Sequence, residues 1–288
     1  MTGRRSVLAA VLAAPIAARA AQAGRIVSIG GSVTETVFAL GAGENVVAVD
    51  STSRFPAQVR ALPQVGYMRA LAPEGLVGLR PDLVLLSEDA GPAQAIAVLR
   101  AAGTPLATIP EAQEPEAVMR KIAAVAAALG TDGASLAAAV RADWALLDAP
   151  IAALQPVRAM FVLSAARGAP LVAGQGTQAD AMLRSAGAVN AVSGFTGYRP
   201  LSAEAAAQAA PEAVVMMDHA IAESGGVEAL LGMPALAVTP VARNRRILVV
   251  DGSYVLGFGP RAAHARRDLA RLVHPGAMLP DLPARAWA

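Results

Sequence analysis

The chain has 288 residues, of which 55% are hydrophobic and only 16% are charged, and its formal net charge is +2. A disordered chain would be more polar, and after the first 20 residues no apolar stretch reaches the roughly 18 residues of a membrane span. The absence of cysteine excludes disulfides, thiolate metal ligands and a lipid-modified N-terminal cysteine. No basic run interleaved with aromatic residues indicates nucleic acid binding.

The first 23 residues have the pattern of a cleavable signal peptide. Arg4 and Arg5 precede a short apolar run at residues 7–18, and residues 21–23 have the small-x-small form of a cleavage site. A buried first helix is the alternative interpretation. Removing residues 1–23 deletes three arginines and no acid, which leaves 21 basic and 22 acidic residues. We therefore expect a nearly neutral protein exported to the periplasm, by the Sec or the twin-arginine route.

From residue 24 onward, short aliphatic runs alternate with helical stretches. Strands are predicted at residues 25–29, 46–49, 83–86 and 106–109, and helices at residues 34–40, 93–102 and 115–129. This alternation is typical of an α/β fold with a parallel-rich sheet. Ser32 and Glu35 have the spacing of a capping box, which predicts that they cap the first of these helices.

Residues 131–155 predict one long helix that links two parts of the chain. Leu136, Val140 and Trp144 begin a broad apolar stripe at helical spacing, and Pro150 should kink or end the helix. We expect this linking helix to join an N-terminal lobe at residues 24–130 to a C-terminal lobe at residues 156–288. A ligand cleft with a rather stiff hinge should lie between the lobes.

The second half of the chain repeats part of the first at a constant offset of 130 residues. Residues 71–86 align without gaps on residues 201–216. Each copy predicts a helix with an acid in its first turn, Glu74 or Glu204, followed by a proline and a buried strand. Two such copies predict two similar, Rossmann-like lobes rather than a repeat array.

Motifs for catalysis and for nucleotide binding are weak. Residues 174–179 match G-x-G-x-x-A, but no acid follows about 20 residues later as a dinucleotide fold requires, so a tight turn beside a ligand is favoured. The histidines, His219, His264 and His274, lack a zinc-binding spacing, and no G-x-S-x-G motif is present. These patterns favour a binding protein, with an enzyme that has a cleft active site as the rival.

Tyr67 is the sharpest candidate for ligand chemistry. It lies in a loop with Gly66, which allows close backbone approach, and with Arg69 two residues later. A nearby cation favours the phenolate, and a phenolate is a hard ligand suited to ferric iron. Arg69 could equally bind a carboxylate. The structural alternative is a tyrosine whose ring packs on the lobe surface.

Six segments carry a family resemblance that runs from about residue 24 to residue 274. They are RIVSIGGSVTET (25–36), VGYMRAL (65–71), LRPDLVL (79–85), VAGQGTQADA (172–181), GYRPLSAE (197–204) and GFGPR (257–261). Through them the chain resembles the periplasmic binding proteins of ABC haem importers, in the helical-backbone class that also carries cobalamin and ferric siderophores. The resemblance implies a monomer that captures one ferric haem b, catalyses no reaction and delivers the haem to a permease dimer with its ATPase.

The resemblance also implies roles for particular residues. Tyr67 would be the axial ligand of the haem iron, and Arg69 would stabilise the phenolate or contact a propionate. Arg167 stands where some relatives have a second ligand histidine, so it is assigned to a propionate and one haem is expected. His219 would donate a hydrogen bond to the Tyr67 oxygen or ligate the iron, with a solvated surface position as the alternative. Glu74 and Glu204 would dock the permease. A cobalamin or ferric-siderophore carrier is the alternative within the family.

Overall fold

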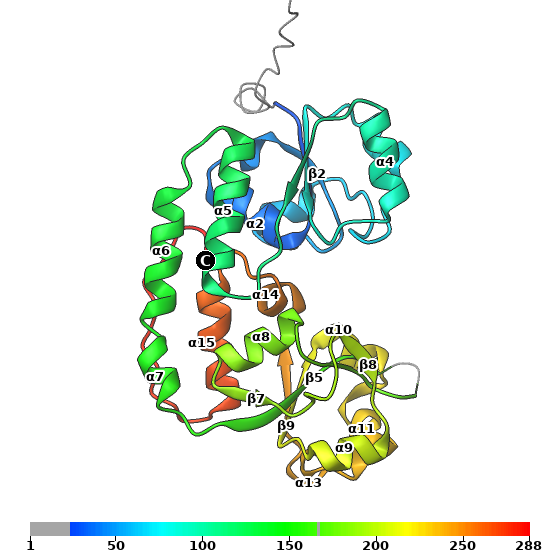
Figure 1. The fold of residues 1–288 in the computed structure, drawn as a ribbon, viewed down its shortest axis with the longest axis vertical. Coiled ribbons are helices and arrows are strands. Elements are labelled where there is room, and N and C mark those ends of the chain that lie inside the picture. Colours follow the sequence, from blue (N-terminus) through cyan, green and yellow to red (C-terminus); the bar gives the residue numbers. More distant parts are fainter. Residues whose placement is uncertain (1–23, 166–167) are drawn as a thin grey trace, which may run out of the picture.

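The structure is a computed structural model that describes residues 24–165 and 168–288. Two α/β lobes lie one above the other along the long axis of the molecule (Figure 1). The described part of the N-terminal lobe has an all-parallel sheet with the strand order β2-β1-β3-β4. Its strands are β1 (Ile26–Ile29), β2 (Val46–Val49), β3 (Leu83–Ser87) and β4 (Leu106–Ile109).

The helices of the N-terminal lobe follow the predicted alternation. They are α2 (Gly31–Ala39), α3 (Pro73–Gly78), α4 (Ala93–Ala101) and α5 (Pro115–Leu129), with short 3-10 helices η1 (Gly43–Asn45) and η2 (Ala57–Ala61). The four strands, α4 and α5 lie within one residue of their predicted bounds. Among the described residues, no helix combines the length and the apolar character that crossing a membrane requires.

The predicted capping box at Ser32 and Glu35 is wrong. Helix α2 begins at Gly31 with Gly30 as its N-cap, and no side chain caps it. Both residues therefore lie inside the helix, where the first-turn bonds of a capping box are not available to them. Their side chains instead bind partners distant in sequence, Lys121 and Arg261.

The C-terminal lobe has a mixed sheet. Within the described residues the strand order is β10-β9-β5-β6-β8, with β7 paired to β5; the pairs β10·β9, β9·β5 and β5·β7 are parallel, and β6 is antiparallel to β5 and β8. The strands are β5 (Val157–Ser164), β6 (Leu171–Ala173), β7 (Ala188–Asn190), β8 (Tyr198–Pro200), β9 (Ala213–Met217) and β10 (Ile247–Val250). The helices are α8 (Gln178–Ser185), α9 (Ala203–Ala209), α10 (Asp218–Glu223), α11 (Gly226–Leu231), α12 (Pro234–Ala237), α13 (Pro240–Asn244), α14 (Gly252–Leu256) and α15 (Ala262–Val273).

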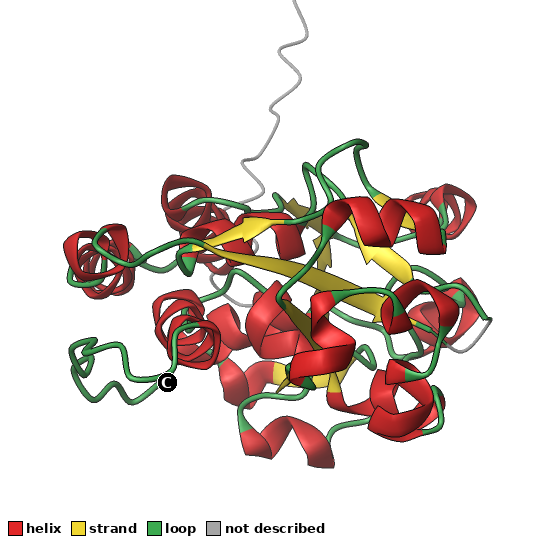
Figure 2. Cartoon of the chain, turned by 90° about the horizontal axis from the view of Figure 1, so that it is seen from below, coloured by secondary structure: helices red, strands yellow, loops and turns green. Residues whose placement is uncertain are grey.

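The repeat at an offset of 130 residues is confirmed in the structure. Helix α3 begins at Pro73 and α9 at Ala203, and strands β3 and β9 run over equivalent positions. All five residues of each strand are buried, as expected for a parallel sheet covered on both faces by helices. Figure 2 shows helices on both sides of the strands. The prediction of an α/β fold with two similar lobes is therefore confirmed.

The segment between the lobes contains two helices instead of one. Helix α6 runs over Ala134–Ala145, a turn follows, and α7 runs over Asp148–Ala152. The proline ring of Pro150 would clash with the carbonyl of Leu146 in a continuous helix, so the chain breaks before the proline rather than at it. Along one side of both lobes lie α5, α6, α7 and α15 (Figure 1). Arg266 of α15 stabilises this side by donating to the Trp144 carbonyl and to Asp148.

Candidate ligand-binding cleft

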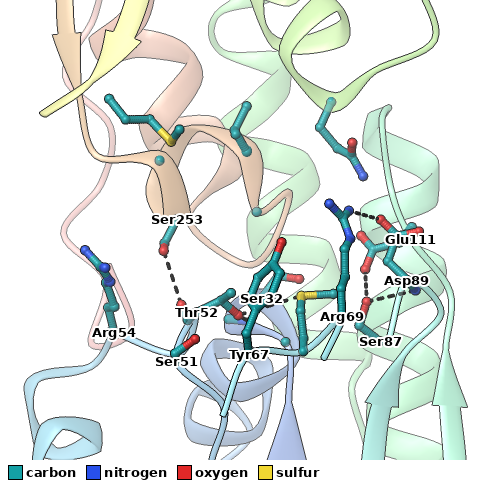
Figure 3. A pocket seen from close by; sticks show the side chains of 18 of the residues that line it. Ser32, Ser51, Thr52, Arg54, Tyr67, Arg69, Ser87, Asp89, Glu111 and Ser253 are labelled. Atoms are coloured by element: carbon teal, nitrogen blue, oxygen red, sulfur yellow. Dashed lines mark hydrogen bonds and ion pairs between the residues drawn. The ribbon is translucent and has the colours of Figure 1, made fainter. Parts of the chain in front are cut away.

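A pocket with a volume of about 400 Å³ lies between the lobes (Figure 3). This volume falls in the range of small-molecule sites, roughly 300–1,000 Å³. The wall from the N-terminal lobe includes residues at or just after the carboxyl ends of all four strands, such as Gly30, Thr52, Ser87 and Glu111, together with the loop that carries Tyr67. Residues after β9 and β10 line it from the other lobe. The pocket therefore occupies the position where parallel α/β sheets bind ligands.

Tyr67 stands in the middle of this pocket on a loop held by backbone hydrogen bonds (Figure 3). The Ser51 amide donates to the Gly66 carbonyl at 2.8 Å, and the Ala70 amide donates to the Tyr67 carbonyl at 2.8 Å. Gly66 has φ 95°, a conformation that favours glycine. The loop is thus fixed while the Tyr67 side chain remains 46% exposed in the pocket. Its phenol is available to a ligand.

Arg69 lies beside Tyr67 and is paired with a carboxylate that the sequence analysis did not single out. Its Nη2 is 2.7 Å from Oδ2 of Asp89, which follows β3. Burial opposes the charged form, but the hydrogen bond to Asp89 and the proximity of the Tyr67 oxygen outweigh it and raise the pKa of Arg69. The guanidinium therefore stays charged next to the Tyr67 phenol.

A buried lysine lies beneath the pocket. Lys121 of α5 is the only lysine in the sequence and is completely buried. Its Nζ donates to Ser32 Oγ at 2.8 Å, to Glu111 Oε2 at 3.1 Å and, in the other lobe, to the Gly257 carbonyl at 3.2 Å. Burial lowers the pKa of Lys121, although the Glu111 carboxylate opposes this shift. Glu111 also accepts a hydrogen bond from Ser87. Through the Gly257 carbonyl, this network links the N-terminal wall of the pocket to the C-terminal lobe.

An ion pair also crosses the interface between the lobes. Arg261 donates from Nε to Glu35 Oε2 at 3.0 Å and from Nη2 to Oε1 at 2.5 Å. The guanidinium also lies 3.7 Å from the centroid of the Phe55 ring. Burial raises the pKa of Glu35 despite the opposing effect of Arg261. Glu35 therefore ties the N-terminal lobe to the C-terminal lobe, which explains this acid better than a helix cap.

The C-terminal lobe contributes His219 and Tyr198 to the pocket. His219 follows β9, its side chain is 46% exposed, and its Nδ1 lies 3.3 Å from Asp218 Oδ1. Tyr198 of β8 is a second phenol, but burial raises its pKa, which disfavours its phenolate. Of the predicted binding residues, Tyr67, Arg69 and His219 thus line one pocket. Arg167 lies outside the described residues.

The predicted docking acids lie away from the pocket. Glu74 and Glu204 occupy the first turns of α3 and α9, one on each lobe, and both are exposed. Arg54 and Asp89 also form part of the pocket wall and were not predicted from the sequence. Each follows a correctly predicted strand within a few residues, and this position at a strand's carboxyl end was the available signal. In the described part of the chain, no group of three His, Cys, Asp or Glu residues could hold a metal ion.

Two α/β lobes whose strands end at a shared pocket define a two-lobed ligand-binding protein. The periplasmic binding protein family matches residues 26–254, and the chain belongs to this family. Its members and structural neighbours are substrate-binding transport proteins.

Solved structures and curated relatives agree with this assignment. The chain is 45% identical to the periplasmic heme-binding protein BhuT in complex with two hemes, over 86% of this chain and 97% of that one, with a TM-score of 0.82. It is 40% identical to the heme-binding protein RhuT from Roseiflexus sp. RS-1, over 87% and 98% of the chains, with a TM-score of 0.84. YvrC of Bacillus subtilis, an ABC transporter substrate-binding lipoprotein, is 28% identical over 87% of this chain and 80% of its own length. A vitamin B12-binding protein of Photorhabdus laumondii is 33% identical, but only over 27% of this chain and 29% of its own.

Proposed function

We propose that this chain is a periplasmic carrier that captures ferric haem b in the cleft and delivers it to an ABC permease dimer with its ATPase. It works as a monomer, catalyses no reaction and is exported to the periplasm by a signal peptide at residues 1–23, which is then cleaved. The observation that carries the proposal is Tyr67, a half-exposed phenol in a pocket between two lobes, with the charged Arg69 beside it. The likeness to heme-binding proteins over most of the chain supports it.

The chemistry of the pocket suits a ferric porphyrin as cargo. A phenolate is an anionic oxygen ligand for ferric iron, and Tyr67 is the exposed phenol with a neighbouring cation. Met68, Met217 and Leu256 offer apolar surface to the macrocycle. We also propose that Arg167 contacts a haem propionate, as the family resemblance implies.

A hemin titration tests this function. The purified mature chain should give a red-shifted Soret band that saturates at one hemin per protein. A saturable band with the charge-transfer absorption of a phenolate-ligated ferric haem supports the proposal. The absence of a saturable band would reject haem as the cargo. Cyanocobalamin in the same assay tests the second candidate, which the partial similarity to vitamin B12-binding proteins favours.

His219→Ala tests the role of the C-terminal lobe in iron ligation. We propose that His219 donates a hydrogen bond to the Tyr67 oxygen, because a carrier that must release its cargo benefits from one iron bond rather than two. His219 lines the same pocket as Tyr67, from the opposite lobe. The variant should keep a high-spin ferric spectrum with a small shift of the charge-transfer band, measured by visible and paramagnetic resonance spectroscopy. A low-spin parent that becomes high-spin would show that His219 is an iron ligand.

Glu74→Ala combined with Glu204→Ala tests permease docking. The two exposed acids occupy equivalent positions on the two lobes, and a two-fold permease can present a basic site to each. The double variant should lose haem transport in reconstituted vesicles while its hemin affinity stays unchanged. Glu44→Ala with Glu223→Ala, at exposed acids outside the pocket, is the matched control. Undiminished transport by the first double variant would contradict the docking role.

A further inference from the structure

The two arginines that line the described pocket differ in what they bind within the protein. Arg69 is held by Asp89 at 2.7 Å, and nearby Glu111 is held by Lys121 and Ser87. Arg54 lines the same pocket and is exposed, and no hydrogen bond or ion pair joins its side chain to any described residue. The charge of Arg54 is therefore available to a ligand, whereas that of Arg69 is already compensated.

The charges of the pocket are also separated in space. Figure 3 shows Arg54 on one side of Tyr67, and Arg69, Asp89 and Glu111 together on the other side. On the second side each cation is already paired with a protein carboxylate, so a ligand carboxylate would meet no uncompensated positive charge there. Asp218 is an acid within electrostatic reach of Arg54, and its Oδ1 already accepts from the His219 amide at 2.7 Å. That bond, and to a lesser degree the charge of Arg54, lowers the pKa of Asp218.

The loop that carries Arg54 has a rigid base. The completely buried Asp50 accepts from the Gly30 amide at 2.9 Å and from the Ser53 hydroxyl at 2.8 Å through Oδ1. Its Oδ2 accepts from the amide and the hydroxyl of Thr52. The backbone next to Arg54 is therefore fixed, and only the side chain must be ordered on binding. This limits the entropy cost of an arginine–carboxylate contact.

We infer that Arg54 anchors the carboxylate edge of the ligand and so sets the orientation of the macrocycle over Tyr67. The inference rests on the proposed function, because it assigns the propionates of haem to the Arg54 side. It also assigns Arg69 to Asp89 and the phenol, not to a propionate. An arginine that binds a carboxylate can make two parallel charged hydrogen bonds, a geometry that neither lysine nor glutamine reproduces.

Esterification of the propionates provides the test. Hemin and hemin dimethyl ester are titrated into the parent, Arg54→Gln and the control Arg60→Gln, which removes an exposed arginine on η2 outside the pocket. The contact is solvent-exposed, so we expect Arg54→Gln to weaken hemin binding about fivefold. Its affinity for the ester should equal that of the parent, and Arg60→Gln should bind both ligands like the parent.

The outcomes separate the inference from the proposed function. If Arg54→Gln has the same ratio of hemin affinity to ester affinity as the parent, Arg54 does not anchor the propionates. The proposed function is unaffected by that result, because the parent still binds haem. If the parent binds neither ligand, both the inference and the proposed function are wrong. The inference is supported if Arg54→Gln loses the preference for hemin over the ester while the parent and Arg60→Gln keep it. The retained affinity for the ester shows that Arg54→Gln is folded.

Discussion

Tyr67→Phe is expected to abolish the phenolate-to-iron charge-transfer band and to weaken hemin binding by about a hundredfold or more. Loss of a residue that merely supports a metal ligand costs about 10–100-fold, so loss of the ligand itself should reach or exceed that range. The variant keeps the aromatic ring, so it removes the iron–oxygen bond with little change to the pocket. Tyr67→Ala should show the same spectral loss. The apolar surface of the cleft should retain a weak affinity for the porphyrin.

Tyr198→Phe is the matched control for this experiment. Tyr198 also lines the pocket, but it lies in the C-terminal lobe and burial raises its pKa, which keeps its phenol neutral. We expect this variant to retain the charge-transfer band, measured by absorption spectroscopy at saturating hemin. A band that persists in Tyr67→Phe and disappears in Tyr198→Phe would assign the iron to the opposite wall of the cleft.

Features of the fold that are determined by residues close together in the sequence could be predicted from it. The strands β2 and β4 were predicted at their observed bounds, because each is a short aliphatic run between polar or turn residues. The repeat revealed two similar lobes, because its alignment required no gaps. Tyr67 could be singled out because its neighbours Gly66 and Arg69 lie in the same loop. The position of His219 near the pocket followed from its place after a buried strand.

Contacts between distant residues could not be predicted in this way. The spacing of Ser32 and Glu35 fits a capping box, but their partners Lys121 and Arg261 lie 89 and 226 residues away. Local spacing contains no information about such partners, and in the structure the tertiary contacts determine the roles of both side chains. The positions of Asp89 and Arg54 after predicted strands indicated the pocket edge, but the sequence could not show which of them a protein charge already pairs.

The contacts of Lys121 predict a second large effect. Lys121→Met replaces the buried ammonium with an apolar side chain of similar length. Glu111 then loses its cationic partner, and Ser32 and the Gly257 carbonyl lose a hydrogen bond donor. Breaking a buried ion pair by removing one partner is costly, because the other group stays desolvated. Since Glu111 retains a bond from Ser87 and some exposure, we expect a loss of about 2–4 kcal/mol in the free energy of unfolding.

Urea denaturation followed by circular dichroism measures this loss. Arg100→Met, at an exposed position in the last turn of α4, is the control and should change the free energy of unfolding by less than about 0.5 kcal/mol. The double variant Lys121→Met with Glu111→Gln should recover part of the loss, because the unpaired carboxylate is then gone. Equal stability of Lys121→Met and the parent would mean that this network does not hold the lobes together.

The pH dependence of stability distinguishes a buried ammonium from simple packing. Burial lowers the pKa of Lys121 in the folded state below its ordinary value of about 10.4. Between the lowered pKa and the ordinary one, the unfolded chain binds a proton that the folded chain does not, so stability rises with pH in this window. Lys121→Met lacks this titration, and the stability of the parent relative to the variant should therefore increase as the pH rises toward about 10. A difference that stays constant over this range would show that the lysine contributes through its shape and not through its charge.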